Sequence, residues 1–382
     1  MAPGIVYECL PETCREQYVL DPMTGSGTTV AVARSRGFNA VGSDTDPLAI
    51  TIARANAGNI DVVRTRKRAA QMLASAQRRA RLIKPDNAYP DYADDETRDF
   101  IDFWFDRRAR VELTALSRTL FDLGLDSDVY LKCAYSRMII TKKRGVSKAE
   151  DVSHSRPHVK RKHPPVYPLQ IFDHCVETVI EAAAFKEKAN LPRASVVKAD
   201  CRKLPFDDAK FDYIITSPPY LNAIDYLRGH KLSLVWLGHT IAGLRDLRSS
   251  NVGCDGGHED DAMDNIVEAM VTSDEKPSQS LRNRLRRYVS DLDEAIAEMR
   301  RVAKSGASLV MVVGDSTIKG CDIQNSIAVD HIAQHHGFAF LGRAIRPLLQ
   351  SRRYLPPPSM KLSGKSLRKR MWNEIVLTYQ AQ

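Results

Sequence analysis

The stretch YVLDPMTGSGTT, residues 18–29, constrains the fold most, because an apolar run ends there on a glycine-rich turn. Gly25 and Gly27 allow positive φ and leave room for a ligand to approach the main chain. Residues 30–33 then continue as a helix, and a second apolar run ends near Asp44. This strand, turn, helix and strand predict a parallel sheet, since parallel strands need a crossover connection.

Later segments continue the same pattern. Three short apolar runs each close on a polar residue, as buried parallel strands do: 194–200, 211–217 and 308–316. Segment 285–306 places its apolar residues on one helical face, with Gly306 as the expected helix stop. We expect 336–345 and 373–379 to pair as the last two strands. Together these patterns predict an α/β fold with a doubly wound, mostly parallel sheet.

Residues 61–193 separate the second strand from the third and are too long for an ordinary crossover. Segments 64–84 and 96–120 look helical, whereas 141–168 is basic and contains prolines, which is typical of an exposed loop. We therefore predict a discontinuous sheet domain, 1–60 and 194–382, and an inserted, mainly helical subdomain, 61–193, with a basic loop.

Composition narrows the functional classes. The chain has 56 Lys and Arg against 47 Asp and Glu and a net charge of +9, which favours a polyanionic partner such as nucleic acid. Its seven cysteines are scattered without a C-x-x-C pair, which predicts reduced thiols and no metal site. The first residues lack a secretory signal, and no run reaches membrane-spanning length without charge. We expect a cytoplasmic protein without a membrane partner.

The glycine turn predicts a cofactor crevice at the carboxyl end of the first strand. No G-K-[ST] follows, which excludes a phosphate loop, and a dinucleotide site would prefer G-x-G-x-x-G. Thr28 or Thr29 is expected to cap the helix that follows. Asp44 stands where a carboxylate would receive the two hydroxyls of a ribose. The alternative is that Asp44 and Asp46 only start a helix at Pro47.

A second motif, TSPPY at 216–220, directly follows the apolar run FDYII. Pro218 and Pro219 lack backbone donors, and a proline forces the residue before it out of the helical region. A buried strand must therefore end there in a rigid turn that carries the ring of Tyr220.

Together, the two motifs resemble the S-adenosylmethionine-dependent amino-methyltransferases that modify exocyclic amines of DNA bases. DPMTGSGTT resembles their cofactor loop, GSDTDP the acidic end of their second strand, and TSPPY their catalytic motif. The resemblance covers roughly 17–56 and 194–320 and implies a Rossmann-like methyltransferase sheet of seven strands. It implies S-adenosylmethionine as cofactor, with Asp44 on the ribose and Asp200 and Cys201 beside the adenine. The implied residues of the cofactor loop are Asp21, Pro22, Met23, Gly25, Ser26, Gly27 and Thr28.

The same resemblance gives the catalytic turn its role. The Ser217 hydroxyl and the Pro218 carbonyl would accept the two amine hydrogens, Pro219 would keep the turn rigid, and Tyr220 would stack on an extruded base. This implies base flipping and no covalent intermediate. Serine before the prolines favours cytosine N4 over adenine N6, with both kept open. Because no cysteine follows a proline, methylation at cytosine C5 is disfavoured.

The implied partners are double-stranded DNA and, within a restriction-modification system, a cognate restriction endonuclease. Candidate target-reading segments are the basic 141–145 and 158–163 of the insertion and 350–371 near the carboxyl end, whose Lys and Arg would neutralise phosphates. Two alternatives stay open. One is an RNA or protein-amide methyltransferase of the same fold; the other is a cofactor-binding or DNA-binding protein without catalysis, which would predict a broken S-P-P-Y.

Overall fold

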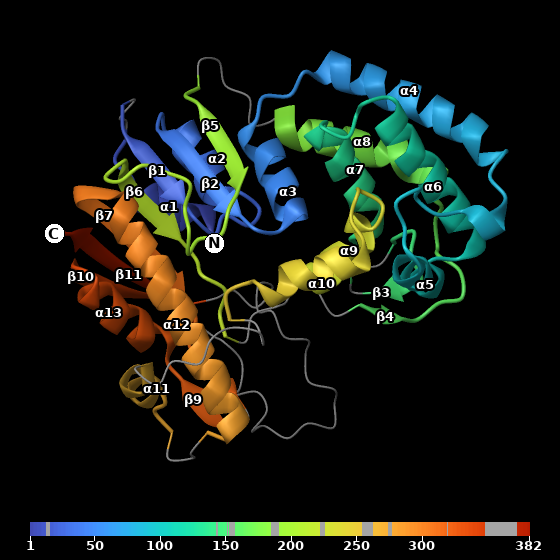
Figure 1. Ribbon diagram of the computed structural model, residues 1–382. Coiled ribbons are helices and arrows are strands. Elements are labelled where there is room, and N and C mark those ends of the chain that lie inside the picture. The colour runs from blue at the N-terminus through green and yellow to red at the C-terminus, as the bar shows by residue number, and fades with distance from the viewer. Residues whose placement is uncertain are drawn as a thin grey trace. The chain divides into compact units, whose positions relative to one another are not determined.

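The computed structural model of the chain separates into two compact units (Figure 1). It describes residues 1–12, 16–142, 144–150, 152, 157–184, 191–221, 226–253, 263–273, 277–318, 320–347 and 373–382. The first unit, which we call the sheet unit, comprises Met1–Thr45, Asn190–Ala223 and Ser249–Gln382; the second, the helical unit, comprises Asp46–Ala189 and Ile224–Arg248. The helical unit thus starts nearer the second strand than the predicted residue 61 and includes a second chain segment.

The sheet unit is built on seven strands in the order β10-β11-β7-β6-β1-β2-β5. The pairs β5–β2, β2–β1, β1–β6 and β6–β7 are parallel, and β11 runs antiparallel to both of its neighbours. The predicted doubly wound, mostly parallel seven-stranded sheet is confirmed, including the pairing of its last two strands. The strands are β1 Tyr18–Asp21, β2 Asn39–Asp44, β5 Ala194–Lys198, β6 Phe211–Thr216, β7 Ala303–Val313, β10 Phe338–Pro347 and β11 Asn373–Ala381.

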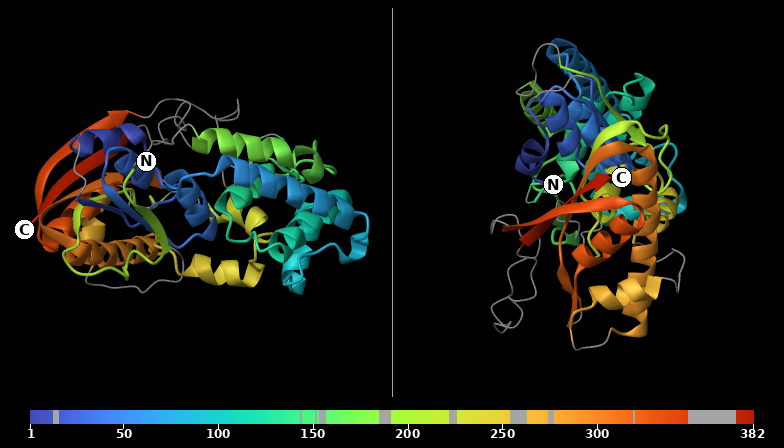
Figure 2. Two further views of the ribbon diagram at one scale, coloured as in Figure 1. Left: turned by 90° about the horizontal axis from the view of Figure 1, so that it is seen from above. Right: turned by 90° about the vertical axis from the view of Figure 1, so that its left-hand side faces the viewer.

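Helices cover both faces of this sheet (Figure 2). Successive side chains of a strand point to opposite faces. In β7, Leu309 and Met311 pack in one core with helices α11 Asp264–Met270, α12 Gln279–Val302 and α13 Asn325–His335. Val312 of the same strand packs instead against α1 Pro3–Cys9, which lies next to α2 Thr28–Ser35. The sheet is therefore buried on both faces, which explains its near-continuous apolar strands.

Gly306 has a different role from the predicted helix stop. Helix α12 ends at Val302, and β7 begins at once with Ala303. Gly306 lies inside β7 at a φ of +78°, where the pairing with β6 shifts between Phe211↔Ala303 and Tyr213↔Ser308. The helix-stop prediction is wrong, because the left-handed glycine belongs to a β-bulge.

The helical unit has its own core, to which Met72, Leu116 and Trp236 contribute. Its helices are α3 Pro47–Ala57, α4 Val62–Ala80, α5 Asp95–Trp104, α6 Arg107–Asp122, α7 Val129–Ile139, α8 Pro168–Ala184, α9 Leu227–Leu234 and α10 Ile241–Ser249, with a 3₁₀ turn at Pro85–Asn87. Its strands β3 Ala149–Glu150 and β4 His158–Val159 form a short antiparallel pair. A similar small pair in the sheet unit joins β8 Ser316–Ile318 to β9 Cys321–Ile323.

The expected exposed loop at 141–168 is thus only partly exposed. Val146, Ala149 and Val152 are buried in the core of the helical unit. The basic character of the segment misled the prediction, because the apolar residues that anchor it are separated by polar ones. The other basic candidate, 350–371, lies outside the described residues.

Close packing between β2 and the glycine turn makes Gly42 a sensitive position. A Cβ atom at Gly42 would lie 2.8 Å from both Thr24 Oγ1 and Val30 Cγ2. We expect Gly42→Ala to lower the free energy of unfolding by about 1–3 kcal/mol, measured by urea denaturation, because the turn must move. Gly4→Ala is the control, since a Cβ there meets no atom within 4 Å. Equal stabilities for the two variants would contradict this packing.

Candidate functional site

The two sequence motifs meet through one hydrogen bond. Asp21 closes β1 and Thr216 closes β6, and these strands are parallel neighbours in the sheet. The Thr216 hydroxyl donates to Asp21 Oδ1 at 2.7 Å, across 195 residues of sequence, and both side chains are buried. The glycine turn and the S-P-P-Y turn therefore leave the same edge of the sheet side by side.

The glycine turn is held open by its backbone. Gly25 and Gly27 have φ values of +51° and +81°. The Thr24 N–H donates to the Ser43 carbonyl at 2.9 Å, and the Gly27 N–H donates to the Thr24 carbonyl at 2.8 Å. A Cβ atom at Gly25 would meet nothing within 4 Å, so space is open beside this backbone. Such a turn lets another molecule approach the main chain.

The expected helix cap at the start of α2 is wrong. Gly27, in the left-handed conformation, occupies the N-cap position, and no side chain caps the helix. Thr29 is buried and interacts with the Asp21 carboxyl instead. Its hydroxyl lies 3.7 Å from Met1 Sδ and also interacts with the Asp21 carboxyl, so α2 begins without a side-chain cap.

The structure separates the roles of Asp44 and Asp46. Asp46 is the N-cap of α3 and accepts from the backbone N–H groups of Leu48 and Ala49. Its other carboxyl oxygen lies 2.6 Å from His230 Nδ1. Asp44 caps no helix, and its Oδ2 accepts from the Gly25 N–H at 2.8 Å. The helix-starting alternative thus applies to Asp46, whereas Asp44 belongs to the glycine turn.

Asp200 and Cys201 follow β5 at the same edge of the sheet. The Arg202 guanidinium binds the Asp200 carboxylate, with Nη2 and Oδ2 2.7 Å apart, and reaches Asp291 of α12. Burial acts to raise the pKa of Asp200, but the bonds and charge of Arg202 outweigh it and lower that pKa. Cys201 is buried, and burial raises the pKa of its thiol, which keeps it neutral.

The S-P-P-Y turn places its polar groups close together. Pro218 is buried and Pro219 is exposed, while Ser217 and Tyr220 are half-buried. The Ser217 Oγ lies 3.4 Å from the Tyr220 hydroxyl. The Tyr220 ring packs on the core that contains α12. Neither proline can donate to the sheet, so β6 stops at Thr216.

Three other predicted residues lie around the glycine turn in different settings. The Pro22 carbonyl accepts from the Ser43 hydroxyl at 3.2 Å, and Met23 packs half-buried against the core of the sheet unit. Ser26 is exposed at the tip of the turn. Their predicted contacts with a cofactor stay predictions, as does that of Thr28, the first residue of α2.

Sequence reasoning missed three residues of this edge: Thr216, Arg202 and Tyr288. Thr216 was read only as part of a motif, and Arg202 gave no signal beyond its place beside Asp200. Tyr288 of α12 is buried, and its hydroxyl has no hydrogen-bond partner among the described residues. Burial raises the pKa of Tyr288 well above its usual range, and the nearby Tyr220 and Asp315 add to the shift.

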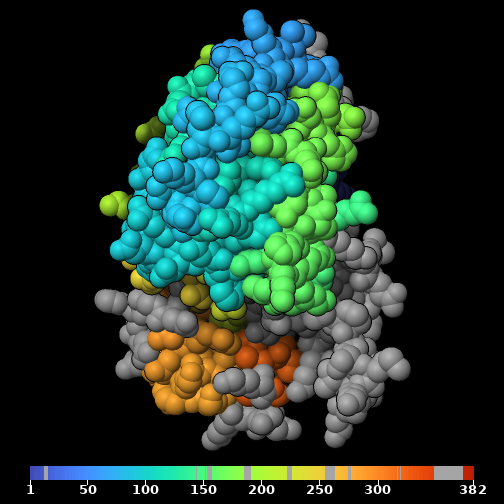
Figure 3. Space-filling view, turned by 90° about the vertical axis from the view of Figure 1, so that its right-hand side faces the viewer, coloured from blue at the N-terminus to red at the C-terminus, as the bar shows by residue number. Residues whose placement is uncertain are grey.

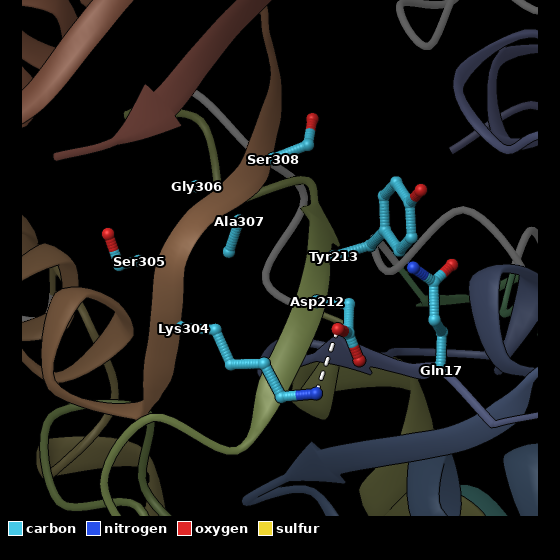
Figure 4. Close-up of a pocket in the computed structure, with 8 residues that line it drawn as sticks. All are labelled: Gln17, Asp212, Tyr213, Lys304, Ser305, Gly306, Ala307 and Ser308. Atoms are coloured by element: carbon cyan, nitrogen blue, oxygen red, sulfur yellow. Dashed lines mark hydrogen bonds and ion pairs between the residues drawn. The ribbon is translucent and has the colours of Figure 1, made fainter.

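A separate hollow of about 230 Å³ lies at the opposite edge of the sheet (Figure 4). It is lined by Gln17 before β1, by the start of β6 and by the bulged start of β7. Its Asp212 carboxylate binds Lys304 Nζ at 2.8 Å and accepts from the Tyr18 N–H at 2.9 Å. These partners hold the starts of the strands together, and the lining of the hollow includes no residue of DPMTGSGTT or TSPPY.

The chain was compared with known proteins. No family model matches it. The type II methyltransferase M.MvaI of Kocuria varians is 23% identical over 395 residues, which cover 94% of this chain and 83% of that protein. M.BsoBI of Geobacillus stearothermophilus is 24% identical over 62% of this chain and 50% of its own length, and M.AvaI of Anabaena variabilis is 29% identical over 38% and 34%.

Over most of its length the chain is similar to a type II methyltransferase. The predicted resemblance to S-adenosylmethionine-dependent DNA methyltransferases, and with it the predicted cofactor, is confirmed by these sequence relatives. The chain spans most of M.MvaI but half or less of the other two relatives.

Solved structures of methyltransferases align with the chain at low similarity. A SAM-dependent methyltransferase of Methanosarcina mazei has a TM-score of 0.35 and 10% identity, covering 100% of this chain and 98% of that one. Geranyl diphosphate C-methyltransferase of Streptomyces coelicolor has a TM-score of 0.36 and 8% identity, covering 100% and 79%. At these values the fold rests on the strand order of the sheet itself.

The residues at the carboxyl ends of β1, β2 and β6 fit S-adenosylmethionine. The left-handed glycines leave main chain and open space at Gly25, and Asp44 brings a carboxylate to the same turn. Within the described ranges, no cluster of His, Cys, Asp and Glu could hold a metal ion, and no helix is both long and apolar enough to cross a bilayer.

The buried Asp21 should make stability depend on pH. Burial raises its pKa from 3.8 to about 6, although bonds from Thr29, Thr216 and the Met23 N–H oppose the shift. Between these values the folded state binds more protons than the unfolded state, so its stability falls as pH rises. Asp21→Asn cannot ionise. Relative to the unmodified protein, we expect it to gain about 2–2.5 kcal/mol of unfolding free energy between about pH 4 and pH 7.

Chemical denaturation of the cofactor-free protein at both pH values measures this difference. Asp200→Asn is the control, because the pKa of Asp200 is lowered and its stabilisation is fully present across that window. A stability difference between Asp21→Asn and the unmodified protein that stays constant with pH would show that Asp21 is ionised without penalty.

Proposed function

We propose that this chain is a DNA methyltransferase that transfers the methyl group of S-adenosylmethionine to the exocyclic amine of a flipped base, namely cytosine N4. The observation that carries the proposal is the Thr216–Asp21 bond, which sets the glycine turn beside the S-P-P-Y turn. The type II methyltransferase relatives support the same reaction class.

Residues of the glycine turn and the end of β2 would hold the cofactor at the carboxyl ends of β1, β2 and β6. The backbone of Gly25 and Gly27 would border it, and the Asp44 carboxylate would receive its ribose hydroxyls. When bound, S-adenosylmethionine supplies a methyl group activated by a sulfonium. Asp21, buried beneath the turn, acts on this site by fixing the turn to β6.

The S-P-P-Y turn would orient the acceptor. An exocyclic amine is a poor nucleophile because its lone pair is delocalised into the ring. The Ser217 hydroxyl and the Pro218 carbonyl are acceptors for its two hydrogens, and the proline pair keeps them in place. Tyr220 offers an aromatic face for a base taken out of the duplex. After transfer, the excess proton can leave to water.

Serine before the prolines supports cytosine N4, and adenine N6 is the second candidate. A restriction endonuclease of the same specificity is the partner that a type II methyltransferase would protect against. The relatives and the net charge of +9 favour DNA over RNA or a protein amide as substrate.

The identity of the acceptor tests the proposal directly. The protein is incubated with labelled S-adenosylmethionine and, separately, with duplex DNA, tRNA, ribosomal RNA or a protein extract. We expect label in DNA alone. Digestion to nucleosides should then recover N4-methylcytosine. N6-methyladenine would correct the base, whereas label confined to RNA or protein would overturn the assignment to DNA.

Two substitutions should separate catalysis from cofactor binding. Ser217→Ala should lower methyl transfer by about 100-fold or more with an unchanged Kd for S-adenosylmethionine, because it removes a contact to the reacting amine. Asp44→Asn keeps an acceptor for the Gly25 N–H but loses the charge, so it should weaken cofactor binding first. Calorimetry and single-turnover kinetics measure the two effects. If each variant lost both properties equally, the assigned roles would be wrong.

A further inference from the structure

Helix α4 carries an unusual set of charges for a surface helix. Residues 62–84 contain eight Lys and Arg and no Asp or Glu. In Figure 3 the blue atoms of α4 run along the surface of the helical unit. Thr65, Ala69, Met72 and Ala76 form its buried stripe, above α6 and α8. Most residues on the remaining face of α4 are exposed.

Three of these cations are neutralised within the unit. Arg66 pairs with Glu177 of α8 at 2.7 Å, Arg68 with Asp128 before α7 at 3.0 Å, and Arg79 with Asp122 of α6 at 2.5 Å. At 3.6 residues per turn these three flank the buried stripe. Their acids come from the neighbouring helices, so they serve packing inside the unit.

Four cations lie on the outward face instead: Arg64, Lys67, Arg78 and Arg81. All four are exposed, and no residue of the described ranges forms an ion pair with any of them. They fall within about 100° of helix circumference, opposite the buried stripe. They form two pairs, Arg64 with Lys67 and Arg78 with Arg81, about 20 Å apart along the helix axis. The exposed positions between the pairs are all neutral: Ala70, Gln71, Ala74 and Gln77.

This arrangement costs the isolated helix stability. Like charges three residues apart repel each other, and Arg64 and Lys67 stand near the positive end of the helix dipole. Among the described residues, the acids that form ion pairs with α4 reach the flanking cations Arg66, Arg68 and Arg79. An external chain of regularly spaced anions would relieve this repulsion at both ends of α4.

We propose that the outward face of α4, formed by Arg64, Lys67, Arg78 and Arg81, binds the phosphate backbone of duplex DNA. The inference rests on the proposed DNA methyltransferase function and adds the surface that holds the duplex. With cations at both ends and a neutral middle, the helix can lie across a groove and neutralise phosphates on each side. These contacts position the duplex and leave base recognition to other residues.

The chain offers a matched pair of variants on this helix. Arg64→Gln with Arg78→Gln removes one outward arginine from each end. Arg66→Gln with Arg79→Gln removes two arginines of the same helix that are already paired with acids. Both double variants change the net charge equally. Calorimetric binding of S-adenosylmethionine and thermal midpoints near those of the unmodified protein show that each variant is folded.

Affinity for a labelled duplex is measured over about 50–200 mM salt. For the outward double variant we expect the slope of log K against log salt to become shallower by about 1.8, since each lost phosphate contact contributes about 0.9. The flank double variant should keep the slope. The assignment of this face is overturned if the slope is unchanged in the outward variant or becomes equally shallower in both variants. If the slope of the outward variant is unchanged, an acidic protein partner becomes the better occupant.

The two proposals fail in distinguishable ways. If the unmodified protein methylates RNA or protein and leaves DNA unlabelled, the proposed function is wrong and the inference falls with it. If the unmodified protein methylates DNA while the outward variant keeps both its salt slope and its methyl transfer, only the role of α4 is wrong.

Discussion

The site depends on a buried hydrogen bond between a carboxyl and a hydroxyl at the ends of two neighbouring strands. Asp21 and Thr216 are both buried, and burying a polar group without a hydrogen-bond partner costs free energy. Because each supplies the other's partner, the ends of β1 and β6 are held at a fixed spacing. The glycine turn and the S-P-P-Y turn follow these strands directly, so their spacing is fixed as well.

Each turn is shaped by residues that restrict or release the backbone. Gly25 and Gly27 adopt left-handed conformations, and the space beside Gly25 is open. Asp44 fixes this turn by accepting a hydrogen bond from the Gly25 N–H. Consecutive prolines end β6 and stiffen the second turn. The two turns thus lie at one sheet edge although their motifs are far apart in sequence, and we propose that one borders the cofactor and the other the acceptor. The helical unit carries a different feature, the outward cationic face of α4, which forms no ion pair within the described part of the chain.

Local sequence patterns predicted the main strands, their mostly parallel arrangement and the glycine turn, because each of these depends on a few neighbouring residues. The contacts that join distant segments were not predictable, because no spacing rule marks Thr216 as the partner of Asp21. Gly306 illustrates a different limit. A left-handed glycine after an amphipathic run suits both a helix end and a β-bulge, and only the pairing with β6 distinguishes them. The basic segment near β3 has the sequence pattern of a loop because its buried Val146 and Val152 are isolated among polar residues.

The central claim is that the sheet edge formed by the ends of β1, β2 and β6 places a methyl donor next to its acceptor. A crystal structure of the protein with S-adenosylmethionine tests it most directly. The account predicts a donor that borders Gly25 and Gly27, has its ribose on Asp44 and turns its methyl group toward Ser217. A donor bound elsewhere, or one whose methyl group faces away from the S-P-P-Y turn, would contradict it.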